Sequence, residues 1–184
     1  MYRLLAVFIV LTLFLGACQS TPAQNDNEEL QKLVDADQND RSTDSDEPIA
    51  PKDDIRRKRV LELLAKNQIV TPQDKYNAAL ILQHTGMVFV GNKLTSKSVE
   101  NHYLAYQLVK SAFEEGYEDA QYFVAVTYDR YSWMSFGYQK YGTQTTYIDD
   151  KPVWVTIDPT TTNEERAQYN VPHLEVLLKQ KPMQ

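Results

Sequence analysis

Two polar side chains occupy a helical face where apolar residues are expected. Gln83 and His84 follow Tyr76 by seven and eight residues, so all three share one face of a helix that is expected to end near Gly86. An inward-facing histidine at this point titrates in the range that general acid and base catalysis uses. The same histidine would equally serve a hydrogen-bonded core network that fixes helix packing.

An acidic side chain stands in a similar position on a helix expected over 118–136. Asp129 shares a face with Val126 and Trp133 and therefore projects from an apolar and aromatic surface. A carboxylate buried on such a surface needs a partner. Arg130 lies about 100° further round the helix and is expected to point elsewhere. The partner is expected from the loop after the helix or from the basic residues Arg56, Arg57 and Arg59.

The loop after this helix, Gln139 to Gln144, is dense in hydrogen-bonding groups, and its glycine permits close backbone approach. The pairs Gln83-His84 and Asp129-Arg130 together with this loop resemble, in order and spacing, an uncharacterised bacterial domain family of unknown function over 55–180. The resemblance implies no reaction, but it implies that these polar groups meet in space. The candidate catalytic or ligand-binding residues are Gln83, His84, Asp129, Arg130, Gln139, Tyr141, Gly142, Thr143 and Gln144.

Two functions of different classes fit these candidates. In the first, a binding module recognises a polar ligand, a glycan strand or a peptide in a cleft lined by tyrosines with Gln83, His84, Gln139 and Gln144. In the second, a hydrolase or transferase uses His84 as general acid or base, with Asp129 orienting it or the substrate and Arg130 holding an anionic group.

Sequence motifs bear on the choice between these functions. The GxSxG, HExxH, P-loop and GxGxxG motifs are absent, and the three histidines lack the spacing of metal ligands. We therefore expect no metal and no cofactor. The binding module is favoured, and the enzyme remains the alternative.

The first residues have the arrangement of a secretion signal. A basic start at Arg3 precedes an apolar run over 4–15, which is shorter than the roughly 20 residues that span a membrane core. The sequence Leu15-Gly16-Ala17-Cys18 resembles the lipobox of bacterial lipoproteins. This resemblance implies removal of the signal peptide 1–17 and attachment of acyl chains such as palmitate to Cys18. A plain secretory signal that happens to contain a cysteine is the alternative.

The residues after Cys18 bear on the location of the protein. In lipoproteins an Asp directly after the cysteine is typical of inner-membrane retention, whereas Gln19 follows it here. The resemblance therefore implies a lipid anchor in the bacterial cell envelope, in the outer membrane facing the periplasm. The expected partners are the membrane, through this anchor, and an envelope protein, peptide or glycan.

Charge is distributed unevenly along the 184 residues. The segment 19–54 holds eleven acidic against three basic residues and few large apolar side chains, which predicts that 18–54 is the lipidated Cys with an acidic disordered tether. The segment 55–184 has a net charge of only +1 and is long enough for one core. Because nucleic-acid binding requires a basic face, no nucleic-acid partner is expected.

The segment 55–184 is predicted to be a mainly α compact domain. Helices are expected over 53–66, 71–86, 98–115 and 118–136, and a short helix should begin at the capping pair Thr162 and Glu165. Alternation over 145–148 and 153–157 predicts one small β-hairpin, and a loop is expected around Gly91. An antiparallel pair of helices that resembles Sel1-like and tetratricopeptide repeats is indicated by Ala105, Ala112, Gly116, Ala120, Gln121, Tyr122, Ala125 and Tyr128.

The lipid anchor is directly testable. A Cys18→Ser variant has no thiol for thioether formation, so it should lose incorporation of labelled fatty acid and should fractionate as a soluble or unprocessed protein. Mass spectrometry of the mature chain and membrane fractionation check this. Unchanged mature mass and unchanged membrane partitioning would contradict the lipobox interpretation.

Overall fold

The computed structural model describes residues 24–43, 48–84, 86–90, 93–149 and 151–180. The predicted signal peptide and Cys18 lie outside these residues. None of the described helices is long and apolar enough to cross a membrane. The elements, in chain order, are α1 (Glu28–Ser42), α2 (Ile49–Ala65), α3 (Pro72–His84), β1 (Met87–Val90), β2 (Lys93–Ser96), α4 (Val99–Glu114), α5 (Ala120–Phe136), β3 (Thr145–Ile148), β4 (Lys151–Trp154), α6 (Asn163–Gln168) and α7 (Leu174–Leu177).

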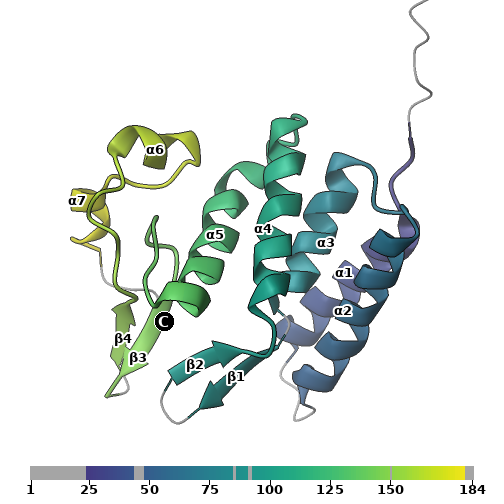
Figure 1. Cartoon of the computed structure of the whole chain (residues 1–184), viewed down its shortest axis with the longest axis horizontal. Helices are drawn as coiled ribbons and strands as arrows, with labels where there is room; N and C mark the ends of the chain where they lie inside the picture. Colours follow the sequence, from purple (N-terminus) through teal and green to yellow (C-terminus); the bar gives the residue numbers. More distant parts are fainter. Residues whose placement is uncertain (1–23, 44–47, 85, 91–92, 150, 181–184) are drawn as a thin grey trace, which may run out of the picture.

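Three helices, α3, α4 and α5, stand side by side in a row and form the centre of the molecule (Figure 1). Helices α1 and α2 pack on α3 at one end of the row. Beyond α5, at the other end, lie the β3–β4 hairpin and the short helices α6 and α7. The mainly α fold with a small β-hairpin is as predicted from the sequence.

Small residues allow these helices to approach closely. Six alanines are fully buried at the contacts among α3, α4 and α5, and their lack of a long side chain brings the helix backbones together. They are Ala78, Ala79, Ala105, Ala112, Ala120 and Ala125. Larger apolar side chains, among them Leu82, Val109 and Val124, fill the remaining core. The expected antiparallel pair of helices with small residues at its contact is therefore α4 and α5.

The expectation of a disordered tether is wrong for most of its length. Residues 28–42 form α1, which begins at Asn27, whose Oδ1 accepts a hydrogen bond from the N–H of Leu30 at 3.0 Å. Leu30 and Val34 lie on one face of this helix and are buried against the domain. The folded unit therefore begins before residue 55, and it includes α1 and α2.

Charge composition misled the prediction because several acidic residues of this segment pair with basic residues within the fold. Glu29 on α1 binds Arg59 on α2 through two hydrogen bonds of 2.5 and 2.8 Å. Asp37 pairs with Arg41 at 3.1 Å, and Asp40 pairs with Lys52 at 3.1 Å. The charges of this segment are thus neutralised in pairs and do not repel one another into an extended chain.

A second hairpin stands where a loop was expected. Strands β1 and β2 pair antiparallel, with Met87 opposite Ser96 and Val90 opposite Lys93. The run Met87 to Val90 is rich in residues that favour strands, but four residues are too few to separate a strand from a loop by periodicity. In the hairpin predicted over 145–157, β4 begins at Lys151 and ends at Trp154, because the turn is shorter than expected.

Helix α1 should contribute measurably to folding stability. Leu30 is fully buried, so Leu30→Ala should lower the free energy of unfolding by about 3 kcal/mol through loss of transfer energy and creation of a cavity. Urea denaturation of the protein measures this. Lys32→Ala, at an exposed position of the same helix, is the matched control and should change stability by less than about 0.5 kcal/mol. Equal effects of both variants would show that α1 does not pack on the domain.

Candidate functional site

Asp129 is fully buried on α5 and binds the backbone of the loop that follows the helix, 139–144. Its Oδ1 accepts hydrogen bonds from the N–H groups of Lys140 and Tyr141, both at 2.8 Å. Its Oδ2 accepts from the N–H and the hydroxyl of Thr143, both at 2.9 Å. Burial raises the pKa of Asp129, and these four donors act against that rise. The partner of Asp129 is thus the loop, which is one of the two sources expected from the sequence.

The carbonyl groups of the same loop bind a buried arginine on α6. Arg166 donates from Nη1 to the carbonyl oxygen of Tyr141 at 2.7 Å and from Nη2 to that of Lys140 at 3.3 Å. The next residue, Gly142, has a φ of 84°, and a Cβ there would collide with the Leu177 side chain of α7. The loop is therefore clamped between a carboxylate that takes its N–H groups and a guanidinium that takes its C=O groups.

Two glutamines complete the loop. Gln139 is fully buried, and its Nε2 donates to the carbonyl oxygens of Gln144 and Val155 at 2.9 and 2.8 Å. Its Oε1 accepts from the N–H of Gln144 at 2.7 Å. The Gln144 side chain turns the other way, and its Oε1 accepts a hydrogen bond from Nε of Arg130 at 3.0 Å. Gln139 thus fixes the loop against the end of the hairpin, and Gln144 connects the loop to α5.

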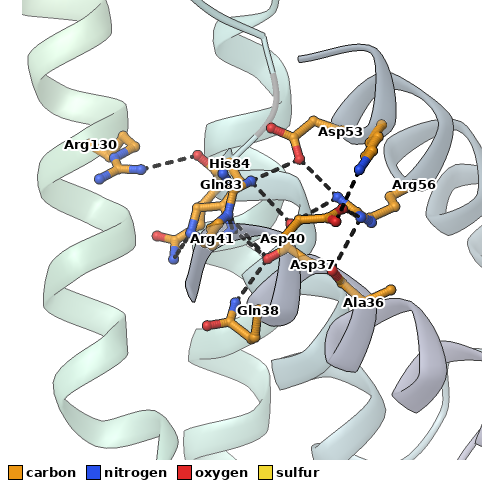
Figure 2. A network of polar contacts seen from close by, with 11 residues as sticks. Ala36, Asp37, Gln38, Asp40, Arg41, Asp53, Arg56, Gln83, His84 and Arg130 are labelled. Carbon is orange, nitrogen blue, oxygen red and sulfur yellow. Dashed lines mark hydrogen bonds and ion pairs between the residues drawn. The ribbon is translucent and has the colours of Figure 1, made fainter. Parts of the chain in front are cut away.

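Arg130 points away from its neighbour Asp129, as the helical spacing predicted. Its Nη1 donates to the carbonyl oxygen of Gln83 at the end of α3, 3.2 Å away (Figure 2). Burial lowers the pKa of Arg130 to about 10, and the nearby positive charge of Arg41 acts in the same direction. Arg130 therefore links the 139–144 loop to the end of α3, where the predicted residues Gln83 and His84 lie.

His84 binds a carboxylate from α1 (Figure 2). Its Nδ1 lies 2.9 Å from Oδ2 of Asp37 and 3.0 Å from Nε of Arg41, and its Nε2 lies 3.5 Å from Nε2 of Gln83. Arg41 also binds both carboxylate oxygens of Asp37, at 3.1 and 3.4 Å. Because Arg41 already has this acceptor, we assign the proton of the neutral imidazole to Nδ1, where it is donated to Asp37.

The charges around His84 keep it neutral. Burial lowers the pKa of His84, and Arg41 and Arg130 lower it further, against the hydrogen bond and the charge of Asp37. For Asp37, burial acts to raise the pKa, but the hydrogen bonds and charges of His84 and Arg41 hold it below the ordinary value. In this pair Asp37 is thus the ionised carboxylate and His84 is the neutral imidazole.

The same network continues into α2 (Figure 2). Arg41 Nη2 pairs with Oδ1 of Asp53 at 2.8 Å, and Arg56 Nη1 lies 3.3 Å from that oxygen. Arg56 also pairs with Asp40 and donates to the carbonyl oxygen of Ala36 at 3.2 Å. Three aspartates and two arginines therefore join α1, α2 and the end of α3.

Eight of the nine predicted residues, all except Gly142, lie along one chain of hydrogen bonds with two separate centres. Asp129 and the 139–144 loop form one centre, and His84 with Asp37 forms the other. Arg130 connects them through Gln144 and the Gln83 carbonyl. Both oxygens of Asp129 face the loop, and the carboxylate that orients the imidazole of His84 is Asp37.

Sequence reasoning missed Asp37, Arg41 and Arg166 as members of this network. A signal for the first two exists, since Asp37 follows Leu30 and Val34 by seven and three residues and precedes Arg41 by four, the spacing of one helical face. For Arg166 no local signal exists, because its partners are carbonyl groups of a loop 25 residues earlier.

Aromatic rings form a continuous surface on α4, α5 and the residues after α5, which we call the aromatic face. It consists of Tyr103, Tyr106, Tyr128, Tyr131, Phe136 and Tyr138. Successive ring centroids lie 4.9 to 6.4 Å apart. Tyr103, Phe136 and Tyr138 are 46%, 59% and 40% exposed, which leaves three rings of the row open to a ligand.

A shallow groove of about 310 Å³ continues from the last ring of this surface. It is lined by Tyr138, Thr156, Ile157, Asp158 and Pro159. Tyr138 thus belongs to both the aromatic face and the groove. Among the described residues, no group of three or more His, Cys, Asp and Glu side chains is arranged to hold a metal ion.

No protein-family model, no curated protein and no solved structure matches this chain. The resemblances noted in the sequence, to lipoproteins, to helical-hairpin repeats and to the uncharacterised domain family, stay predictions.

The hydrogen bonds of Asp129 predict a structural role for it. Asp129→Asn keeps the shape but places an amide N–H₂ against donors of the loop, so the free energy of unfolding should fall by about 3 kcal/mol. Denaturation of the protein in urea measures this. Asp119→Asn, at an exposed position before α5 that makes no capping hydrogen bond, is the control and should have little effect.

Double-mutant cycles separate the two centres. Asp129→Asn combined with Thr143→Val should cost less than the sum of the single changes, because both break the same contacts. Asp129→Asn combined with His84→Ala should be additive to within about 0.5 kcal/mol. Strong coupling between Asp129 and His84 would contradict the assignment of two centres.

Proposed function

We propose that this chain is an envelope lipoprotein, anchored through Cys18 in the outer membrane and facing the periplasm, which presents a helical binding module. The binding surface is the aromatic face, and the ligand is an extended glycan strand or peptide of the envelope. The observation that carries the proposal is the unbroken row of ring contacts on α4 and α5 with three of its rings exposed.

Aromatic side chains suit this function for two reasons. They are large and rigid, so little conformational entropy is lost when a flat ligand stacks on them. The tyrosines among them also carry hydroxyl groups that donate and accept hydrogen bonds at the edge of the stacked surface. An exposed apolar surface of several joined rings is typical of interaction sites.

The internal contacts of the predicted polar residues also support binding over catalysis. The Asp129 carboxylate and the Gln139 amide are committed to backbone groups of the 139–144 loop. Both ring nitrogens of His84 face protein groups, with Nδ1 toward Asp37 and Nε2 toward Gln83. A general base needs a nitrogen that reaches the substrate, so the enzyme alternative receives less support.

Substitutions on the aromatic face test this proposal. Tyr103→Ala and Phe136→Ala remove exposed rings, so each should leave stability nearly unchanged but weaken ligand binding about 30-fold, as expected for loss of about 2 kcal/mol. Sedimentation with purified peptidoglycan strands and a peptide array measure binding of the mature chain to the two ligand classes.

Leu178→Ala is the matched control, since Leu178 is 60% exposed but lies after α7, outside the aromatic face. It should bind as the unsubstituted protein does. Equal loss in all three variants, or no binding of the unsubstituted protein to either ligand class, would contradict the proposal.

A further inference from the structure

Arg130 has hydrogen-bond donors left over after its contacts in the fold are counted. A guanidinium carries five N–H donors, and Arg130 uses Nε for Gln144 and one N–H of Nη1 for the Gln83 carbonyl. Neither acceptor is charged. Within the part of the chain that the structure describes, Arg130 forms no ion pair with a carboxylate, no hydrogen bond joins its Nη2 to a protein group, and the residue is only partly buried.

The other buried arginines differ from Arg130 in this respect. Arg56 pairs with Asp40 and Asp53. Burial lowers the pKa of Arg166, and the negative charge of Asp129 acts against this decrease. Burial, and after it the positive charge of Arg41, lowers the pKa of Arg130, and no carboxylate among the described residues pairs with it. Its own positive charge is therefore not compensated.

Two neutral histidines border this uncompensated charge. His84 is at the end of α3, and its side chain remains 17% exposed. His102 on α4 is buried, and burial together with the charge of Arg130 lowers its pKa to about 4. Its Nε2 contacts the Ser96 hydroxyl at 2.9 Å, while its Nδ1 has no partner. The buried Oε1 of Gln83 also lacks a partner.

The geometry of Arg130 suits an oxyanion. Its hydrogen bond to Gln144 holds the guanidinium from the side of the 139–144 loop. Its hydrogen bond to the Gln83 carbonyl holds it from the end of α3 (Figure 2). The free N–H groups of Nη1 and Nη2 lie in one plane, and two parallel donors of this kind match a carboxylate or phosphate. A donor whose orientation is already fixed loses little entropy on binding.

We propose that Arg130 is the anchor of an anion-binding site between α3 and α5, which takes the phosphate or carboxylate group of a small ligand. The ligand oxygens accept from the Nη1 and Nη2 groups of Arg130. The side-chain amide of Gln83 lies at the border of this site and supplies a further donor when it rotates. The site is separate from the aromatic face and does not depend on the proposed function.

Binding of inorganic phosphate and of acetate tests the proposal. The full mature chain is titrated with each anion at constant ionic strength, with chloride as the balancing salt. The side-chain Nε–H resonance of Arg130 in ¹⁵N-labelled protein should shift with one of the two anions in a saturable way, and the melting temperature should rise with that anion. The anion with the lower dissociation constant identifies the ligand group as phosphate or carboxylate.

Substitutions assign the effect to Arg130. Arg130→Gln should raise the dissociation constant of the anion at least tenfold, and Arg130→Lys, which keeps the charge but not the paired donors, should raise it by a smaller factor. Arg57→Gln is the control, since Arg57 lies on α2 and pairs with Asp54 at 3.3 Å, and should bind as the unsubstituted protein does. Circular dichroism establishes that each variant is folded.

Three results would overturn the proposal. The first is an absence of any saturable shift of the Arg130 resonance with either anion. The second is a melting temperature that rises equally in Arg130→Gln. The third is a loss in Arg57→Gln as large as that in Arg130→Gln, which would indicate a general effect of surface charge. If Arg130→Gln does not fold, the resonance titration and the Arg130→Lys variant still decide the matter.

Discussion

The clamp on the 139–144 loop is the constraint on which the second half of the molecule depends. Asp129 and Arg166 are both fully buried, and each alone would carry a large desolvation cost. Together they bind the N–H and C=O groups of the same short loop. This arrangement fixes where the chain leaves α5, and so it sets the positions of the β3–β4 hairpin, of α6 and of the rings around Tyr141.

This constraint divides the polar residues of the chain into two kinds. Those near Asp129 bind buried backbone groups, and their hydrogen-bonding atoms are therefore occupied by contacts that stabilise the fold. Arg130, one residue further along α5, is also a candidate site residue in the sequence, but it keeps N–H donors that the fold does not use. Adjacent residues of one helix therefore serve different purposes, because a rotation of about 100° places them in different surroundings.

Local patterns in the sequence were sufficient for helices α3, α4 and α5 and for the inward position of Asp129, since both follow from helical periodicity. They were not sufficient for the partner of His84. Asp37 lies 47 residues earlier, in a segment whose composition is typical of a disordered chain. Glu29 and Asp40 of this segment pair with Arg59 and Arg56, which only the tertiary fold brings near. Local composition does not show which charges distant in sequence will pair, so these ion pairs could not be predicted from it.

The position of α1 also limits how far the domain can stand from a membrane. If Cys18 carries lipid, only eight residues lie between the anchor and Asn27, the residue that caps α1. A fully extended chain of this length reaches about 30 Å, roughly the diameter of a small domain. The module would then bind ligands close to the bilayer surface, because its tether is too short to reach across the full depth of the periplasm.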